Sequence, residues 1–469
     1  MSQNLWLGLA ALVSIVCLFW LVWDMRRQPL PHILVFAVFA IFFRFLLSAF
    51  HPYTFPPLAG PLSINALYSA GVIGLGFLLI DHRLLRLRFL LPVYGLLVLI
   101  MASAFYNDTQ KDSIDSLLKW LFFVVISLAV YESVIRAGRA LTLEKLFKSF
   151  CIPTLLQLLS VVVGYSKFSE SDHSVSYVGG YHHEAVFSVI MITALMLSAL
   201  RQTVLPGAPR SWSLLPLVLA MNVALTNYRT NILSMLLPLW GYLYVRFLRR
   251  GAPLAKVFAA LVLTAGVLLV AMLDFSALVD RFAEIGTVMD ESAKLIKSPL
   301  YYTEWEKDYF SARVYIWSQY IDAYVNSNGM QHLIGMGADS WEHQFRIYAH
   351  NTFVSYLFEL GLLGCSVIAY FFLRNMARCF NGPLTTYSLL LFLCFLGFLV
   401  MNLGTMPLWQ VEGMILFAIL NALAWELNLT GTVPAPAATG PDHQVPVLTQ
   451  PVSTQDTMDT PAISHQARA

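Results

Sequence analysis

The chain has 469 residues, of which 58% are hydrophobic and only 12% charged. Because an average soluble domain is roughly 25% charged, this composition excludes an ordinary soluble protein. The formal net charge of +2 gives no reason to expect nucleic-acid binding. The five cysteines lack metal-ligand spacing, so we interpret them as small hydrophobic residues.

Apolar runs long enough to span a bilayer recur along the chain, since about 20 apolar residues cross its hydrocarbon core. The first run lacks a basic region before it, so we interpret it as a retained helix rather than a signal peptide. The sixth, seventh and eighth runs are short. The sequence predicts an all-α polytopic membrane protein with about 12–13 transmembrane helices, centred on 5–23, 32–50, 61–80, 89–105, 116–134, 151–166, 185–200, 213–226, 230–248, 257–275, 351–373, 388–405 and 410–428.

The placement of Lys and Arg predicts the orientation of these spans, because cytoplasmic loops carry an excess of both. Basic residues collect in alternate connections, beginning with Arg26 and Arg27, and the opposite connections are nearly free of them apart from the long one at 276–350. The N-terminus is then outside. We expect spans in 1–275 and 351–429, a large extracytoplasmic loop with helices at 276–350, and a disordered cytoplasmic tail at 430–469, which is rich in Pro, Ala, Thr and Ser.

The loop 276–350 is polar but rich in Tyr and Trp, which argues against disorder. Within it, Arg313, Trp317, Tyr320 and Tyr324 recur at helical spacing and share one face of a predicted helix. A guanidinium on that face suits bidentate binding of phosphate oxygens. The alternative is an arginine that snorkels at the membrane interface.

A tight turn with Gly335 and Gly337 follows, and then His350 and Asn351 at the outer start of the eleventh span. We expect Asn351 to cap that helix, whose N-terminus would favour an anion. His350 could serve there as a general base or a phosphate donor. The alternative is a histidine that is only hydrated at the interface.

Two outside connections carry further candidates. Arg229 lies where the positive-inside pattern disfavours an arginine, which favours a functional reason for its presence there. His182, His183 and Glu184 precede a helix start, but without the spacing of helical metal ligands we expect no metal site.

Charges inside predicted spans are functional candidates by default, and Arg44, Lys119 and Glu359 are the ones considered for this site. Arg44 is near the outer end of the second span and could line an outward-facing cavity. Lys119 is close enough to the interface to snorkel, which is the reading we favour for it. Glu359 could pair with a basic residue that the sequence does not identify.

The order of these features resembles the O-antigen polymerase and O-antigen ligase superfamily of bacterial inner-membrane glycosyltransferases. The matching stretches are Arg313 to Trp317, Gly335 to Gly337, Ala349 to Phe353, and Glu359 to Gly364. In that family a loop arginine opens a helix, a G-x-G turn follows, and a His-Asn pair precedes a span. Arg229 matches a family arginine in position, but its neighbours Tyr228 and Thr230 depart from the family's pattern.

The resemblance implies a GT-C-like membrane glycosyltransferase that uses a polyprenyl-diphosphate-linked glycan at the periplasmic side of the inner membrane. It implies metal-independent, inverting transfer without a cofactor, because arginines can hold the departing diphosphate. We expect His350 and Arg313 to be catalytic, Arg313, Arg229 and Arg44 to bind the diphosphate, and acceptor or sugar contacts from Trp317, Tyr320, Asn351 and His183.

Three functions remain open from the sequence. The first is a polymerase that extends an exopolysaccharide or O-antigen, with a chain-length regulator and a flippase as further partners. The second is a ligase that moves the glycan to lipid A core. The third is a non-enzymatic flippase, which would be expected to show two similar halves that this sequence lacks.

Overall fold

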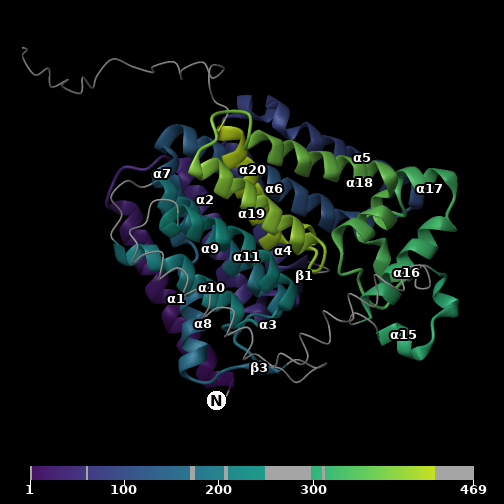
Figure 1. The fold of residues 1–469 in the computed structure, drawn as a ribbon, viewed down its shortest axis with the longest axis horizontal. Helices are drawn as coiled ribbons and strands as arrows, with labels where there is room; N and C mark the ends of the chain where they lie inside the picture. Colours follow the sequence, from purple (N-terminus) through teal and green to yellow (C-terminus); the bar gives the residue numbers. More distant parts are fainter. Residues whose placement is uncertain are drawn as a thin grey trace, which may run out of the picture. The chain divides into compact units, whose positions relative to one another are not determined.

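The structure is a computed structural model that describes residues 3–59, 62–168, 175–204, 210–248, 297–308 and 312–427. The predicted run 257–275, residues 276–296 of the predicted loop and the predicted tail 430–469 lie outside the described residues. The described residues are mostly helical (Figure 1).

The longer helices up to residue 204 are α1 (Gln3–Arg26), α2 (His32–Ala49), α3 (His51–Thr54), α4 (Ile64–Leu79), α5 (Leu91–Asn107), α6 (Gln110–Ala137), α7 (Arg139–Lys148), α8 (Cys151–Val162) and α9 (Glu184–Val204). Those that follow are α10 (Leu215–Ala224), α11 (Arg229–Leu243), α15 (Glu304–Asp308), α16 (Arg313–Val325), α17 (Gly329–Ile334), α18 (Thr352–Arg378), α19 (Thr386–Asn402) and α20 (Val411–Glu426).

Short elements connect them. Two antiparallel strand pairs are β1 (Pro57–Ala59) with β2 (Leu62–Ser63) and β3 (Lys167–Phe168) with β4 (Val175–Ser176). The 3-10 turns are η1 (His82–Arg86), η2 (Arg88–Leu90), η3 (Arg210–Leu214), η5 (Pro299–Tyr301), η6 (Ser340–His343) and η7 (Pro407–Trp409), and a π-helical turn, η4 (Tyr244–Leu248), follows α11.

Six described helices are long and apolar enough to cross a membrane: α1, α2, η2 with α5, α6, α9 and α18. The pair α7 and α8, bent by 41°, makes a seventh if it is one broken span. Together with α4, α10, α11, α19 and α20, these helices coincide with the predicted runs other than 257–275. The all-α polytopic class is therefore confirmed. The predicted count of about 12–13 spans exceeds the six or seven supported here, because several of the other helices are too short for a core about 30 Å thick.

The core lies where α6 and α20 pack along each other, with α9, α18 and α19 around them. Helix α20 is mostly apolar and is buried on all sides from Val411 to Ala424, as expected for a helix surrounded by others. The ring of Phe417 lies 4.9–5.3 Å, centroid to centroid, from four rings of α6, α18 and α19, which belong to Phe123, Phe371, Phe372 and Phe398. Aromatic pairs at this distance add to the free energy gained by burial.

Helix α18, which lies beside α5 in Figure 1, is broken at Gly361, where φ is +65° and ψ is −164°. A break in a helix leaves carbonyls without their usual donors. The turn after α17 supplies donors here: the Met336 N–H bonds to the Phe358 carbonyl at 2.9 Å and the Gly337 N–H to the Glu359 carbonyl at 3.0 Å. The predicted G-x-G turn is thus docked into the break of the eleventh predicted span.

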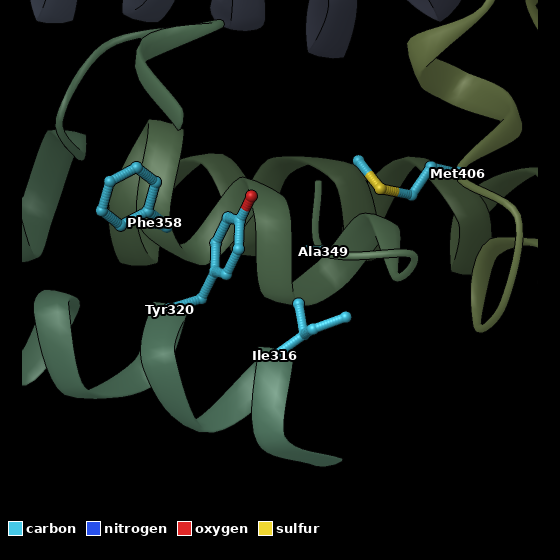
Figure 2. Packing of buried hydrophobic residues seen from close by; sticks show 5 residues of the cluster. All are labelled: Ile316, Tyr320, Ala349, Phe358 and Met406. Atoms are coloured by element: carbon cyan, nitrogen blue, oxygen red, sulfur yellow. The ribbon is translucent and has the colours of Figure 1, made fainter. Parts of the chain in front are cut away.

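Helix α16 packs on α18 and on the segment that enters it, through the predicted aromatic face. Tyr320 is fully buried and its hydroxyl donates to the Ile347 carbonyl at 3.1 Å, while the Trp317 Nε1–H donates to the Ala349 carbonyl at 2.8 Å. Figure 2 shows Tyr320 and Ile316 of α16 pointing toward Phe358 and Ala349. The segment just before His350 is therefore held by α16.

We predict that Gly361→Ala strongly destabilises the protein. A Cβ at Gly361 would lie 2.5 Å from the Leu333 carbonyl group, and the backbone conformation is one that essentially only glycine adopts. Strain costs about 1–3 kcal/mol, and overpacking adds about 1–3 kcal/mol. The melting temperature of the purified protein in detergent measures the loss.

Gly138→Ala is the matched control. Gly138 has a similar conformation, with φ +79° and ψ 155°, but nothing lies within 4 Å of a Cβ built there. Gly138→Ala should therefore lose only the stability that backbone strain costs, without the loss from overpacking. Equal melting temperatures for the two variants would contradict the docking role of Gly361.

Candidate functional site

A cavity of about 530 Å³ lies among the ends of α2, α4, α6 and α9 and the segments around His182 and η7. Its wall combines charged, amide and aromatic side chains, among them Arg44, Asn65, Lys119, His183, Tyr348, Trp409, Gln410 and Glu412. This volume falls within the range of roughly 300–1,000 Å³ that is usual for small-molecule sites.

Arg44 lines this cavity, as the sequence suggested. Its Nε donates to the Glu412 Oε1 at 3.0 Å, and the Ser48 hydroxyl donates to the same oxygen at 2.8 Å. Both charged side chains are at least nine-tenths buried. The guanidinium is therefore committed in part to a carboxylate, which does not favour the predicted binding of diphosphate by Arg44.

Lys119 also lines the cavity. The expectation that it snorkels to the membrane interface is therefore not met. Its side chain is only 14% exposed, its Nζ lies 2.5 Å from the Asp115 Oδ2, and it faces the Trp409 ring at 4.8 Å. It is also electrostatically coupled to Asp339 and Glu359. The sequence showed a lysine inside a predicted span, but only the fold brings its acidic partners next to it.

Glu359 is held at the break of α18 by two hydrogen bonds. It accepts from the Ser355 hydroxyl at 2.5 Å and from the Asp339 N–H at 3.0 Å. Asp339 itself accepts from the Ser116 hydroxyl at 2.8 Å, and burial raises the pKa of its carboxyl despite the opposing effect of Lys119. The basic residue coupled to Glu359, which the sequence left unidentified, is Lys119.

Arg313 begins α16 and lies next to the start of α11. Its Nη1 donates to the Thr230 hydroxyl at 3.4 Å, and its charge acts on Tyr228 and on Tyr348, which lines the cavity. Arg229 precedes Thr230 as the first residue of α11 and is half-buried. The structure thus brings the start of α11, where Arg229 lies, next to Arg313.

His350 lies close enough to Arg313 to be affected by its charge, and its backbone is in the left-handed region at φ +53°. Its ring is 4.0 Å from the Tyr348 ring, centroid to centroid. Its Nδ1 is buried and has no hydrogen-bond partner among the described residues. Burial, and then the charge of Arg313 and the proximity of His183, lower the pKa of His350 to about 4. The imidazole is therefore neutral near pH 7 and can accept a proton.

We name Arg313, His350, Tyr348, Tyr228 and His183 the arginine–histidine cluster. His183 belongs to both the cluster and the cavity, and its Nδ1 accepts the Ala185 N–H at 3.0 Å. Burial lowers the pKa of His183, so it too favours the neutral form. Tyr228 and Tyr348 were not predicted as site residues. They reach Arg313 only because three segments that are separate in the sequence pack together in the fold.

Asn351, Tyr320 and Trp317 were also predicted to contact the acceptor or sugar, and the structure places each of them differently. Asn351 caps α18 as predicted, with its Oδ1 accepting from the Phe353 and Val354 N–H groups at 2.9 and 3.2 Å. Tyr320 has no exposed surface, which corrects the expectation that it contacts acceptor or sugar. Trp317 is half-buried with its N–H occupied by Ala349. Among the described residues no three His, Cys, Asp or Glu side chains are grouped to hold a metal ion.

Comparison with protein families gives one match. Residues 214–369, about a third of the chain, match the family described as O-antigen ligase. This match supports the resemblance to the O-antigen polymerase and ligase superfamily. The matched region contains Arg229, Arg313, His350 and Glu359, so the resemblance carried by the motifs is confirmed. A search of curated proteins finds no significant match.

The similarity of residues 214–369 to this family supports a glycosyltransferase-like or ligase activity on glycan or lipid-linked substrates in a membrane. Arg313 and the proton-accepting His350 lie together beside a cavity that contains two further cations, each paired with a carboxylate. Such a site can stabilise a leaving anion and take a proton from an attacking hydroxyl.

We predict that Arg44→Met destabilises the protein by about 3–5 kcal/mol, because it leaves the buried Glu412 carboxylate without its cation. The double variant Arg44→Met/Glu412→Leu removes both charges and should recover most of the loss. Melting temperatures of the single and double variants in detergent provide the comparison. If both variants lose the same stability, the pair is not the reason for the burial of Arg44.

Proposed function

We propose that the chain is a polysaccharide polymerase. It would join oligosaccharide repeat units linked to polyprenyl diphosphate, on the periplasmic face of the inner membrane. The observation that carries this proposal is the cluster of Arg313 with a neutral His350 at the edge of a cavity. The family match supports glycan chemistry, and the positive-inside pattern supports a periplasmic location.

In the proposed reaction a hydroxyl of the acceptor sugar attacks the anomeric carbon of the donor. His350 accepts the hydroxyl proton as the new C–O bond forms. The bond from the anomeric carbon to the diphosphate oxygen breaks, and its electron pair leaves with the lipid diphosphate. Arg313, with Arg229 at the start of α11, stabilises the negative charge of that leaving group. Attack from the face opposite to the diphosphate inverts the anomeric configuration.

A ligase remains the second candidate, because the matching family is described as O-antigen ligase. The acceptor would then be lipid A core. Product analysis separates the two: the purified protein in lipid nanodiscs receives radiolabelled lipid-linked glycan, with and without lipid A core. A ladder of repeat units on the lipid carrier supports the polymerase. A label that moves only to lipid A core supports the ligase.

We predict that Arg313→Lys loses most transfer activity, since an ammonium cannot replace the bidentate guanidinium on a diphosphate. Arg313→Ala should lose at least as much. Arg346→Ala is the matched control, because Arg346 is an exposed arginine of the same loop. The transfer rate per folded protein is the measurement. Wild-type rates for Arg313→Ala at normal protein levels would disprove the role.

We predict that His350→Ala slows the chemical step by roughly two to four orders of magnitude, while lipid-linked donor still binds. His343→Ala, at an exposed histidine of the same loop, should leave the rate unchanged. Single-turnover rates separate chemistry from binding. If His350 orients the diphosphate instead, donor binding should weaken together with turnover, and a native rate would exclude both roles.

The pH dependence provides a further prediction for the same residue. Because the folded pKa of His350 is about 4, kcat/KM should be level above about pH 5 and fall as pH drops through 4. The bound diphosphate favours the imidazolium, so the acid limb of kcat should lie at higher pH. Rate profiles between pH 4 and 8 test this. Coincident limbs near pH 6.5, the ordinary value, would contradict it.

A further inference from the structure

Helices α11 and α19 pack along each other, and the turn that follows α19 comes very close to the start of α11 at Gly404. Gly404 is buried. A Cβ built on it would lie 2.5 Å from the Thr230 Cγ2 and 2.8 Å from the Thr230 Oγ1, so the approach requires a residue without a side chain. Thr230 is the residue whose hydroxyl accepts a hydrogen bond from the Arg313 guanidinium.

Tyr228 makes a second contact between Gly404 and the same arginine. Its hydroxyl donates to the Gly404 carbonyl at 3.2 Å. A tyrosine hydroxyl has one hydrogen, so its oxygen then remains available as an acceptor. That oxygen accepts a hydrogen bond from Arg313. Gly404 therefore contacts two residues, Thr230 and Tyr228, that both accept from Arg313.

The two residues before this glycine contact the other half of the arginine–histidine cluster. The Thr352 hydroxyl donates to the Asn402 Oδ1 at 2.8 Å, and the Asn351 Nδ2 donates to the Leu403 carbonyl at 3.4 Å. Asn351 and Thr352 directly follow His350 in the chain. The end of α19 thus contacts both the residues that hold Arg313 and the residues that follow His350.

We propose that Gly404 is a positioning residue for the transfer reaction. It lets the end of α19 approach α11 so closely that Thr230 and Tyr228 hold the Arg313 guanidinium in one orientation. The proposal rests on the proposed function for what Arg313 binds. It adds a residue that lies outside 214–369, the region that matches the family. Gly404 acts through Arg313 and touches no reacting atom itself.

Orientation matters because a guanidinium binds phosphate oxygens through two parallel N–H groups in a fixed plane. A group that is misplaced by about 1 Å can lower a reaction rate by about 10². A methyl group on Gly404 would have to push Thr230 away by a comparable distance, because ordinary contacts to a Cβ are longer than 3.4 Å. The Arg313 side chain would lose its present support.

The experiment compares Gly404→Ala with the unchanged protein, each purified and reconstituted in lipid nanodiscs. Titration with inorganic pyrophosphate measures anion binding, and mass spectrometry measures the rate at which phenylglyoxal modifies Arg313. Gly404→Ala should bind pyrophosphate about tenfold more weakly, because charge-assisted hydrogen bonds depend on the placement of the guanidinium. Arg313 should be modified several times faster, because it is held less firmly.

Gly241→Ala is the matched control for damage to the packing of the same two helices. A Cβ on Gly241 would lie 2.4 Å from the Leu393 Cδ1, a clash similar to the one at Thr230. Gly241 lies about 16 Å further along α11 than Thr230, at 1.5 Å per residue. Pyrophosphate affinity and Arg313 labelling per folded protein should be unchanged. Equal losses in Gly241→Ala and Gly404→Ala would overturn the proposal.

Two further substitutions test the route from Gly404 to Arg313. Thr230→Ser removes the Cγ2 that the new methyl group would meet and keeps the hydroxyl, so Gly404→Ala/Thr230→Ser should regain most of the lost affinity. Tyr228→Phe removes the hydroxyl between Gly404 and Arg313 and should also weaken pyrophosphate binding and speed labelling. If Gly404→Ala fails to fold, Tyr228→Phe decides alone. Native affinity and labelling in Tyr228→Phe would then reject the proposal.

Arg313→Ala in the same titration distinguishes this proposal from the proposed function. If Arg313→Ala binds pyrophosphate as tightly as the unchanged protein, the proposed role of Arg313 fails. The labelling of Arg313 in Gly404→Ala needs no ligand, so it still decides whether Gly404 positions Arg313. If pyrophosphate binding depends on Arg313 but a folded Gly404→Ala shows native affinity and labelling, the proposed function stands and the role of Gly404 fails.

Discussion

The structure depends on the docking of the Gly335–Gly337 turn into the break of α18. Inside a bilayer, backbone groups must find partners within the protein, so an interrupted helix needs donors from elsewhere. The Met336 and Gly337 N–H groups supply them to two carbonyls of α18. The approach is so close that a Cβ on Gly335 would lie 2.2 Å from the Glu359 carbonyl group. Glycine at this turn and at the break is therefore a packing requirement.

This contact fixes the two ends of the segment that carries the site. At one end, the Asp339 N–H binds Glu359, and both acidic residues are coupled to Lys119 of α6. At the other, Asn351 caps α18 while α16 covers the residues before it. His350 is held between these anchors in a surrounding of low polarity, next to a permanent cation. That surrounding disfavours the imidazolium, and the resulting neutral ring is what a proton-accepting step requires.

The cavity cations are balanced by carboxylates at 2.5–3.0 Å, which makes burial of these charges tolerable. Arg313, in the neighbouring cluster, donates to the Thr230 hydroxyl and acts electrostatically on Tyr228. In the proposed reaction its guanidinium stabilises the negative charge of the leaving diphosphate.

The sequence by itself determined the features that arise from neighbouring residues. Apolar runs specified the helices, Asn351 was identified as a cap, and helical spacing predicted the face of α16 that packs inward. Only the tertiary structure decided which distant residues meet. Arg44 pairs with Glu412, 368 residues away, and Tyr320 on the predicted face is buried rather than open to a ligand. Helix formation and capping depend on contacts within a few residues, whereas burial and ion pairing depend on how whole helices pack.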